Sequence, residues 1–200
     1  MNDDSPLTLI LVTGLPASGK TVLSQKIAEA IQLPLISKDG IKEVLLDNLG
    51  WSDIQWSMKL GRTTYDLVFY FIERQLKGGS SLIVESPFHP EFHNERLQEL
   101  QKLYHFQCVQ ILCYANGKVL LERYKHRSQS IERHPGQDKA EDIAGFEAKM
   151  LKEKDRTLEL KGPIIEVDTT DFVQIDEEGI FKQLRELLGP KGLTSHRHVT

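Results

Sequence analysis

The feature that most constrains this chain is the sequence Gly-Leu-Pro-Ala-Ser-Gly-Lys-Thr at residues 14–21, a complete G-x-x-x-x-G-K-[ST] pattern. The run before it, residues 7–13, is apolar and rich in β-forming residues, as expected of a strand buried on both faces. The run after it, residues 22–31, places apolar side chains on one helical face. A strand, a glycine-rich turn and a helix in this order predict a loop that binds phosphate.

The chemistry of this loop follows from its residue types. Gly14 and Gly19 let the backbone approach a phosphate closely, and the start of the following helix favours an anion. Lys20 is expected to reach the β- and γ-phosphates of a nucleoside triphosphate, and the Thr21 hydroxyl to ligate Mg²⁺. The predicted cofactors are therefore ATP and Mg²⁺. The loop residues predicted to bind the nucleotide are Gly14, Pro16, Ala17, Ser18, Gly19, Lys20 and Thr21.

Length and composition describe one soluble domain. The chain has 200 residues, of which 40% are hydrophobic and 27% charged, and its net charge of −4 disfavours a long nucleic acid as partner. No apolar run approaches the ~20 residues that a membrane span needs. The N-terminus lacks the basic start and apolar core of a signal peptide, so we expect a cytoplasmic protein. We expect it to be a monomer or a homodimer.

Two cysteines are present. Cys108 and Cys113 fall in one expected strand at an odd separation, which points them to opposite faces of a sheet. They should therefore be free thiols rather than a disulfide, as in a reducing compartment.

Apolar strand-like runs alternate with longer helical patterns, which is typical of a parallel α/β sheet. A helix is expected over about residues 54–77, another around residues 97–103, and a last one that Gly189-Pro190 ends. We assign residues 1–191 to a single domain and residues 192–200 to a flexible tail. The expected strands are Thr8–Thr13, Pro34–Ser37, Ser81–Glu85, Gln107–Tyr114 and Ile164–Val167.

The segment at about residues 125–156 is dense in charge and is broken by His134-Pro135-Gly136. One interpretation is a solvated helical hairpin. The other is a helical lid that closes over the nucleotide, and its place after the fourth strand favours the lid.

Two carboxylates stand at the carboxyl ends of strands, where ligands of open parallel sheets bind. Asp39 follows the second strand and is a candidate base toward an acceptor hydroxyl, although it could also only cap the next helix. Glu85 ends the third strand, where it could hold the water of Mg²⁺, contact the substrate, or be a surface acid.

Several other side chains are candidates for the same site. Arg123 and Arg127 lie four residues apart and so share a helix face, from which Arg127 could neutralise charge on a transferring phosphoryl group. Arg133 is a weaker candidate for that role. Arg62 could meet an anionic acceptor or be a surface charge, and the loop around Phe88 could give the acceptor pocket an aromatic wall.

The loop at 14–21, the run Ile36-Ser37-Lys38-Asp39, the strand end at Glu85 and the run at 121–127 together resemble a group of small P-loop kinases. The group includes polynucleotide 5′-hydroxyl kinase, zeta-toxin-like and chloramphenicol phosphotransferase-like proteins, and AAA-type ATP-binding homologues. The match covers most of residues 7–170. The sequence lacks the sensor motifs of ring-forming AAA motors, and it lacks the additional phosphatase or RNA-binding domain that marks nucleic-acid end-repair kinases.

This resemblance implies a P-loop NTPase fold with a five-stranded parallel sheet in the order 2-3-1-4-5. It also implies that the acid matching Asp39 is the base, that the arginines matching Arg123 and Arg127 contact phosphates, and that the loop containing Thr169 lies near the adenine. We therefore expect a kinase that transfers the γ-phosphate of ATP to a hydroxyl of a small molecule. The alternative is an ATP-binding switch or slow ATPase that signals to a protein partner, and a toxin-like kinase acting on a nucleotide sugar differs from the first only in its acceptor.

Overall fold

The computed structural model describes residues 7–128 and 157–192. The described strands are β1 (Thr8–Gly14), β2 (Leu35–Ser37), β3 (Leu82–Glu85), β4 (Gln107–Tyr114) and β5 (Ile164–Asp168). The helices are α1 (Lys20–Ile31), α2 (Lys38–Leu49), α3 (Ile54–Lys77), α4 (Pro90–Tyr104), α5 (Gly117–Ser128), the 3₁₀ turn η1 (Phe172–Gln174) and α7 (Glu177–Gly192).

The strands form one parallel sheet in the order β2-β3-β1-β4-β5, which confirms the predicted fold class. β1 lies at the centre, paired with β3 on one side and β4 on the other, and all seven of its residues are buried. This burial explains why its sequence is continuously apolar instead of alternating.

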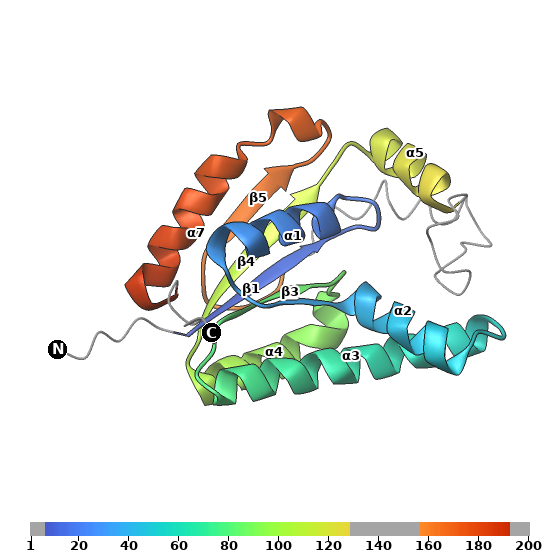
Figure 1. Cartoon of the computed structure of the whole chain (residues 1–200), viewed down its shortest axis with the longest axis horizontal. Helices are drawn as coiled ribbons and strands as arrows, with labels where there is room; N and C mark the ends of the chain where they lie inside the picture. The colour runs from blue at the N-terminus through green and yellow to red at the C-terminus, as the bar shows by residue number, and fades with distance from the viewer. Residues whose placement is uncertain (1–6, 129–156, 193–200) are drawn as a thin grey trace, which may run out of the picture.

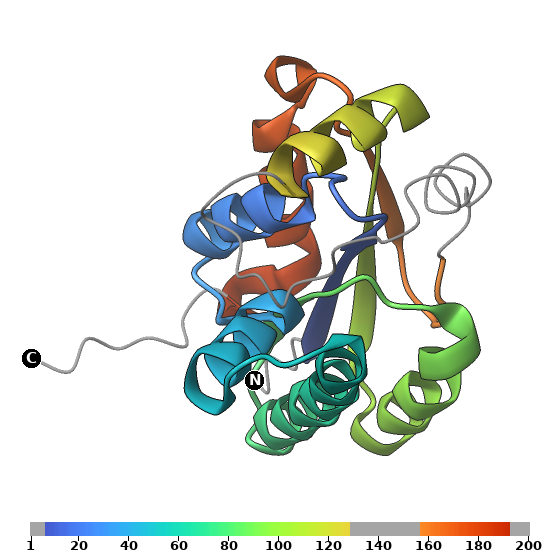
Figure 2. The ribbon, with the colours of Figure 1, turned by 90° about the vertical axis from the view of Figure 1, so that its right-hand side faces the viewer.

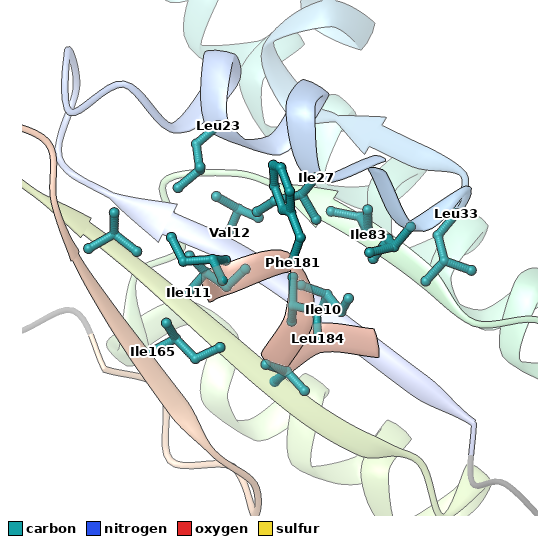
Figure 3. Packing of buried hydrophobic residues seen from close by; sticks show 14 of the residues in the cluster. Ile10, Val12, Leu23, Ile27, Leu33, Ile83, Ile111, Ile165, Phe181 and Leu184 are labelled. Atoms are coloured by element: carbon teal, nitrogen blue, oxygen red, sulfur yellow. The ribbon is translucent and has the colours of Figure 1, made fainter. Parts of the chain in front are cut away.

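Helices cover both faces of the sheet (Figures 1 and 2). On one face, α1 and α7 pack against Ile10 and Val12, and Figure 3 shows Leu23 of α1 and Phe181 of α7 in this cluster. On the other face, α3 and α4 pack against Leu9 and Leu11. The alternation along β1 therefore divides its side chains between two separate cores.

The two cysteines follow the same alternation. Cys108 belongs to the core on the α3–α4 face and Cys113 to the core on the α1–α7 face, and both are free, as predicted. Burial raises the pKa of each thiol to about 12, so both stay protonated at neutral pH.

Two helix boundaries differ from the expectation. α2 begins at Lys38, because the Ser37 hydroxyl accepts the Gly40 amide and caps the helix in place of Asp39. Near the C-terminus, Gly189 (φ 65°) breaks α7, but the chain resumes helical turns to Gly192 after this kink. None of the described helices has the length and apolar character to cross a membrane.

Part of the expected organisation lies outside the described residues. The first residues of the predicted lid form the end of α5, whereas residues 129–156 are not described. The same holds for residues 193–200 of the predicted tail.

The segment that leads into β5 is held by side-chain amides instead of by a strand. Gln110 donates to the Leu158 carbonyl (2.9 Å) and accepts the Leu158 amide (2.8 Å), and Gln101 makes the same pair of bonds with Lys161. Leu158 itself is buried. These bonds satisfy backbone groups that no neighbouring strand reaches.

Candidate active site

The loop at 14–21 turns sharply between β1 and α1. Gly14 (φ 144°) runs so close to β4 that an added Cβ would lie 2.1 Å from the Cys113 carbonyl oxygen. Ala17 (φ 64°) and Gly19 (φ 76°) adopt left-handed conformations. The Lys20 ammonium crosses back and donates to the Leu15 carbonyl at 2.9 Å. Alternating backbone hands of this kind turn successive amides toward one point, as an anion site requires.

A cavity of about 630 Å³ opens in front of this loop. Figure 1 shows that α1, α2 and α5 all begin at this end of the sheet. Its lining unites seven of the predicted nucleotide and acceptor residues with seven that sequence analysis missed. The predicted residues are Ala17, Gly19, Lys20, Thr21, Asp39, Arg123 and Arg127. The additional ones are Val22, Gln25, Leu35, Ser37, Gly40, Glu43 and Phe172.

Lys20 and Glu85 form the electrostatic centre of the site. Both are buried. Burial lowers the pKa of Lys20, and the nearby carboxylates of Glu85 and Asp39 oppose that shift. Burial likewise raises the pKa of Glu85, and this shift is opposed by Lys20 and by a hydrogen bond from Ser37. Each charge thus depends on the other in a site with little water.

The two predicted carboxylates occupy different depths. Glu85 does not line the cavity but accepts a hydrogen bond from the Ser37 hydroxyl at 2.8 Å. Asp39 lines the cavity with a side chain 39% exposed. Because Ser37 caps α2, Asp39 is released from the capping role and faces the space in front of Lys20.

Arg123 of α5 lines the same cavity and is held in place by three contacts. Its guanidinium donates to the carbonyls of Thr169 (2.8 Å) and Thr170 (3.1 Å) and lies 4.3 Å from the centre of the Phe172 ring. Its other terminal nitrogen is buried without a hydrogen-bond partner among the described residues. A buried donor of this kind fits an anionic or carbonyl-bearing ligand.

Of the predicted site residues that do not line the cavity, three more lie away from it or behind it. Phe88 is fully buried among aromatic side chains of the α3–α4 face, so it cannot wall the cavity. Arg62 lies on an exposed position of α3 and does not line the cavity. Thr169 is buried, and its hydroxyl donates to the carbonyls of Ser18 (2.8 Å) and Tyr114 (2.9 Å). It supports the loop from behind and makes no contact with the cavity.

The donor set suits a hard cation that brings most of its own ligands. The Thr21 hydroxyl and the Asp39 carboxylate line the cavity. The Glu85 carboxylate lies behind the Ser37 hydroxyl, which donates a hydrogen bond to it. Among residues 7–128 and 157–192, no group of three or more His, Cys, Asp or Glu could hold a metal ion. Mg²⁺ fits such a site, because it retains waters and phosphate oxygens beside one or two protein ligands.

Sequence reasoning missed Phe172 and Ser37. Phe172 follows β5 by four residues and no motif marks it, since its role depends on the approach of Arg123 from α5. Ser37 was detectable in principle, because a serine that precedes a helix is a common N-cap. Its second bond, to Glu85, depends on the parallel pairing of β2 with β3.

Comparison with solved structures places the fold among kinases. A protein provisionally described as a kinase from Chloroflexus aurantiacus is 40% identical, with a TM-score of 0.83 over 92% of this chain and 100% of that one. A sugar kinase from Janibacter is 15% identical (TM-score 0.57; 92% and 95% of the two chains). Shikimate kinase from Bacteroides thetaiotaomicron is 18% identical (TM-score 0.52; 91% and 98%). The latter two show the fold alone.

None of the curated proteins compared matches the chain. Among protein families, the model described as AAA domain, AAA_33, matches residues 9–150. That match spans the phosphate-binding loop, both candidate carboxylates and the arginines of α5. The fold, the loop and the matched length lead to one conclusion: the chain belongs to this AAA domain family of P-loop proteins.

Proposed function

We propose that the protein is an ATP-dependent phosphotransferase that moves the γ-phosphate to a hydroxyl of a small-molecule acceptor. The observation that carries the proposal is the single cavity that Lys20, Thr21, Asp39 and Arg127 line together. It supplies a phosphate-binding loop, a carboxylate at the acceptor end and cations around the space between them.

The acceptor oxygen attacks the γ-phosphorus while the bond from that phosphorus to the bridging oxygen of ADP breaks. The electron pair of the broken bond stays on ADP, and Lys20 and Arg127 stabilise the charge that spreads over the transferring group. The hydroxyl proton passes to the carboxylate of Asp39 and returns from there to water. Thr21 would hold Mg²⁺, with Glu85 behind the cavity lining, and the ion would neutralise part of the phosphate charge during transfer.

The relative from Chloroflexus aurantiacus supports a kinase, because its provisional description as a kinase comes with 40% identity over nearly the whole chain. The proposal includes membership of the group of zeta-toxin-like and chloramphenicol phosphotransferase-like kinases. It also includes a lid over residues 125–156 and a single domain over residues 1–191. We further propose a cytoplasmic location and a monomeric or dimeric state. The candidate acceptors are a sugar, an antibiotic, a nucleotide sugar and an oligonucleotide end.

The experiment is a transfer screen with [γ-³²P]ATP and Mg²⁺ against pooled sugars, antibiotics, nucleosides and 5′-hydroxyl oligonucleotides. We expect label on one class of acceptor, and loss of that label in Asp39→Asn. A second function, an ATP-binding switch or slow ATPase, predicts no labelled acceptor and an unchanged rate of hydrolysis in Asp39→Asn. These two results together would contradict the kinase and support the ATP-binding switch or slow ATPase.

A further inference from the structure

A second hollow, the apolar groove, lies beside β2 at the edge of the sheet and has a volume of about 390 Å³. Its apolar side chains come from three elements: Ile36 of β2, Ile41 and Val44 of α2, and Phe71 of α3. Helices α2 and α3, which form its walls, lie side by side (Figures 1 and 2).

The lining of the apolar groove includes large side chains that are exposed. Val44 is 60% exposed and Phe71 is 40% exposed. A single exposed apolar side chain is common on a protein surface, whereas several that line one groove indicate a binding site. Among the described residues of this lining, Ser37 and Gln75 supply the polar side chains and none is charged. The groove therefore suits an apolar group and not a phosphate.

The apolar groove adjoins the cavity of the candidate active site. Leu35, Ser37 and Gly40 line both of them. The two hollows therefore meet where β2 ends and α2 begins. One ligand could occupy both, with one end in front of the phosphate-binding loop and the other between α2 and α3.

Gly40, at this junction, has no evident role in the fold. It lies in the first turn of α2 without a positive φ, so its backbone conformation does not require glycine. An added Cβ would lie 3.5 Å from the nearest atom, Cβ of Ser37, which is an ordinary contact. Because glycine in a helix costs stability relative to alanine, its presence indicates that space is needed outside the fold.

The size of the apolar groove distinguishes between a small molecule and a protein. Ligand pockets have volumes of roughly 300–1,000 Å³, and this groove lies within that range. A stable protein partner covers about 800 Å² on each side, much more than such a groove presents. The edge strand β2 offers three residues for pairing with another strand. A small molecule therefore fits better than a second copy of the chain or an added strand.

We propose that the apolar groove binds an aliphatic or aromatic part of the acceptor, while a hydroxyl of the same molecule lies in the cavity in front of Lys20 and Thr21. The acceptor class is then an alcohol with a hydrophobic substituent. This inference rests on the proposed function for its role in transfer. The binding of an apolar group is a property of the chain itself and can be measured without ATP.

The first test is a methyl NMR titration of the full chain with 1-butanol and 1-hexanol. We expect shifts at the methyl groups of Ile36, Ile41 and Val44, and an affinity that increases up to about fourfold per added methylene. The methyl groups of Val173, which is 92% exposed and outside the groove, serve as the internal reference. Shifts that are absent from the groove, or equal at Val173, overturn the proposal.

Val44→Asn should weaken the binding of 1-hexanol by at least about fourfold, the effect of one lost methylene contact. Leu49→Asn is the matched control, because Leu49 lies on the same helix, is 58% exposed and does not line the groove. Equal weakening in the two variants contradicts the site. Light scattering is measured on the same samples, and a mass that falls from dimer to monomer in Val44→Asn would make the groove an interface between copies and overturn the proposal.

Gly40→Ala tests why the glycine is present. This variant should raise the midpoint of urea unfolding and, in the presence of the acceptor found in the transfer screen, raise KM for that acceptor about tenfold. Gly61→Ala is the control: Gly61 lies inside α3 without a positive φ, has no atom within 4 Å of an added Cβ, and lines neither hollow. It should raise the midpoint and not KM. A lower midpoint in Gly40→Ala, or an equal rise of KM in both variants, overturns the proposal.

The last test uses the same acceptor with Val44→Asn. KM for the acceptor should rise about tenfold with little change in kcat, because the groove binds a part of the molecule that does not react. An unchanged KM contradicts the proposal. If the wild type labels no acceptor, the proposed function fails and with it the role of the groove in transfer. The titration with 1-hexanol then decides separately whether the groove binds apolar ligands.

Discussion

At the scale of single residues, the candidate site depends on charges that burial has made unstable by themselves. Lys20 and Glu85 are both shifted toward their neutral forms by burial, and each is stabilised by the charge of the other. A triphosphate entering the cavity would bring a stronger counterion to Lys20. In the proposed transfer, the ammonium group would lie where negative charge develops, which is the arrangement that lowers a reaction barrier most.

Replacing Lys20 by alanine should reduce the rate of phosphoryl transfer by about 10²–10³-fold, the usual loss when one preorganised contact to the transition state is removed. Lys26→Ala is the control, because Lys26 lies on the same helix but pairs with Glu177 at the outer surface. Steady-state kinetics give the rates, and circular dichroism verifies that both variants fold. A Lys20→Ala enzyme with near-normal turnover would contradict the role.

The second prediction at this scale concerns His93. Burial lowers the pKa of His93, whose Nδ1 lies 2.9 Å from both the amide nitrogen and the carbonyl oxygen of His89. Because the folded state disfavours the charged ring, this group leaves stability unchanged above its ordinary pKa of 6.5 and reduces stability as the pH falls below that value.

Urea denaturation at about pH 7.5 and about pH 5.5 measures the effect of His93. The wild-type midpoint should fall more over this interval than that of His93→Asn, which keeps an acceptor but cannot titrate there. Equal falls for the two proteins would remove His93 from the explanation.

The position of a site residue could be predicted from the sequence where a local motif determines it, and not where a distant contact does. The proposed roles of Lys20 and Asp39 follow from a loop pattern and a strand end, and the structure brings both residues to one cavity. Thr169 and Phe88 were misplaced, because a residue number after a strand does not tell whether its side chain turns to the cavity or into the core. Phe172 was invisible for a related reason, since its partner Arg123 is 49 positions away in the sequence.

At the scale of elements, the unusual part is the segment before β5, which side-chain amides hold in place of a strand. Gln110, buried in the middle of β4, satisfies both backbone groups of Leu158. Gln98 makes a single, exposed bond to the Glu159 carbonyl. The two glutamines therefore allow a comparison of a buried pair of bonds with one exposed bond.

Gln110→Met removes the paired bonds with little change in side-chain length. It should lower the free energy of unfolding by about 1–3 kcal/mol, because the buried Leu158 amide is left unpaired, whereas the Leu158 carbonyl still accepts the Leu160 amide. Gln98→Met should lower it by at most about 1 kcal/mol, since water replaces the lost bond. Equilibrium urea unfolding measures both, and equal losses would show that burial is not the deciding factor.

Element types could be predicted because apolar periodicity and parallel alternation are strong local signals. The strand order came from the resemblance to small P-loop kinases, since no local pattern fixes which strands are neighbours. The start of α2 was less accurate, since Ser37 and Asp39 are both good capping residues and only the backbone decides between them. The amide anchors of residues 158–161 have no signal at all. They require α4 and the incoming segment to meet, which no local pattern reports.

At the scale of the molecule, the site forms where the carboxyl ends of the central strands meet the start of α1 and the passage of α5 (Figure 1). No single element contains it. Ligand binding should therefore stabilise the whole domain instead of one part, because the elements that hold the nucleotide are also those that hold the sheet together.

Addition of ATP and Mg²⁺ at about one hundred times the dissociation constant should raise the free energy of unfolding by roughly 2.7 kcal/mol. Thermal melts with and without nucleotide measure this rise. Gly14→Ala should abolish it, because an added Cβ lies 2.1 Å from the Cys113 carbonyl oxygen and must displace the loop. A Gly14→Ala protein that keeps the full rise would show that the loop does not hold the phosphates.

The bonds of Thr169 have a consequence for how the protein meets its nucleotide. One hydroxyl ties the Ser18 carbonyl to the end of β4, so the fold itself fastens to the sheet the turn that would receive an anion. Its conformational entropy is lost once, during folding, and little remains to be lost on each encounter. The nucleotide can then bind without a prior rearrangement of the loop, and the product can dissociate without one.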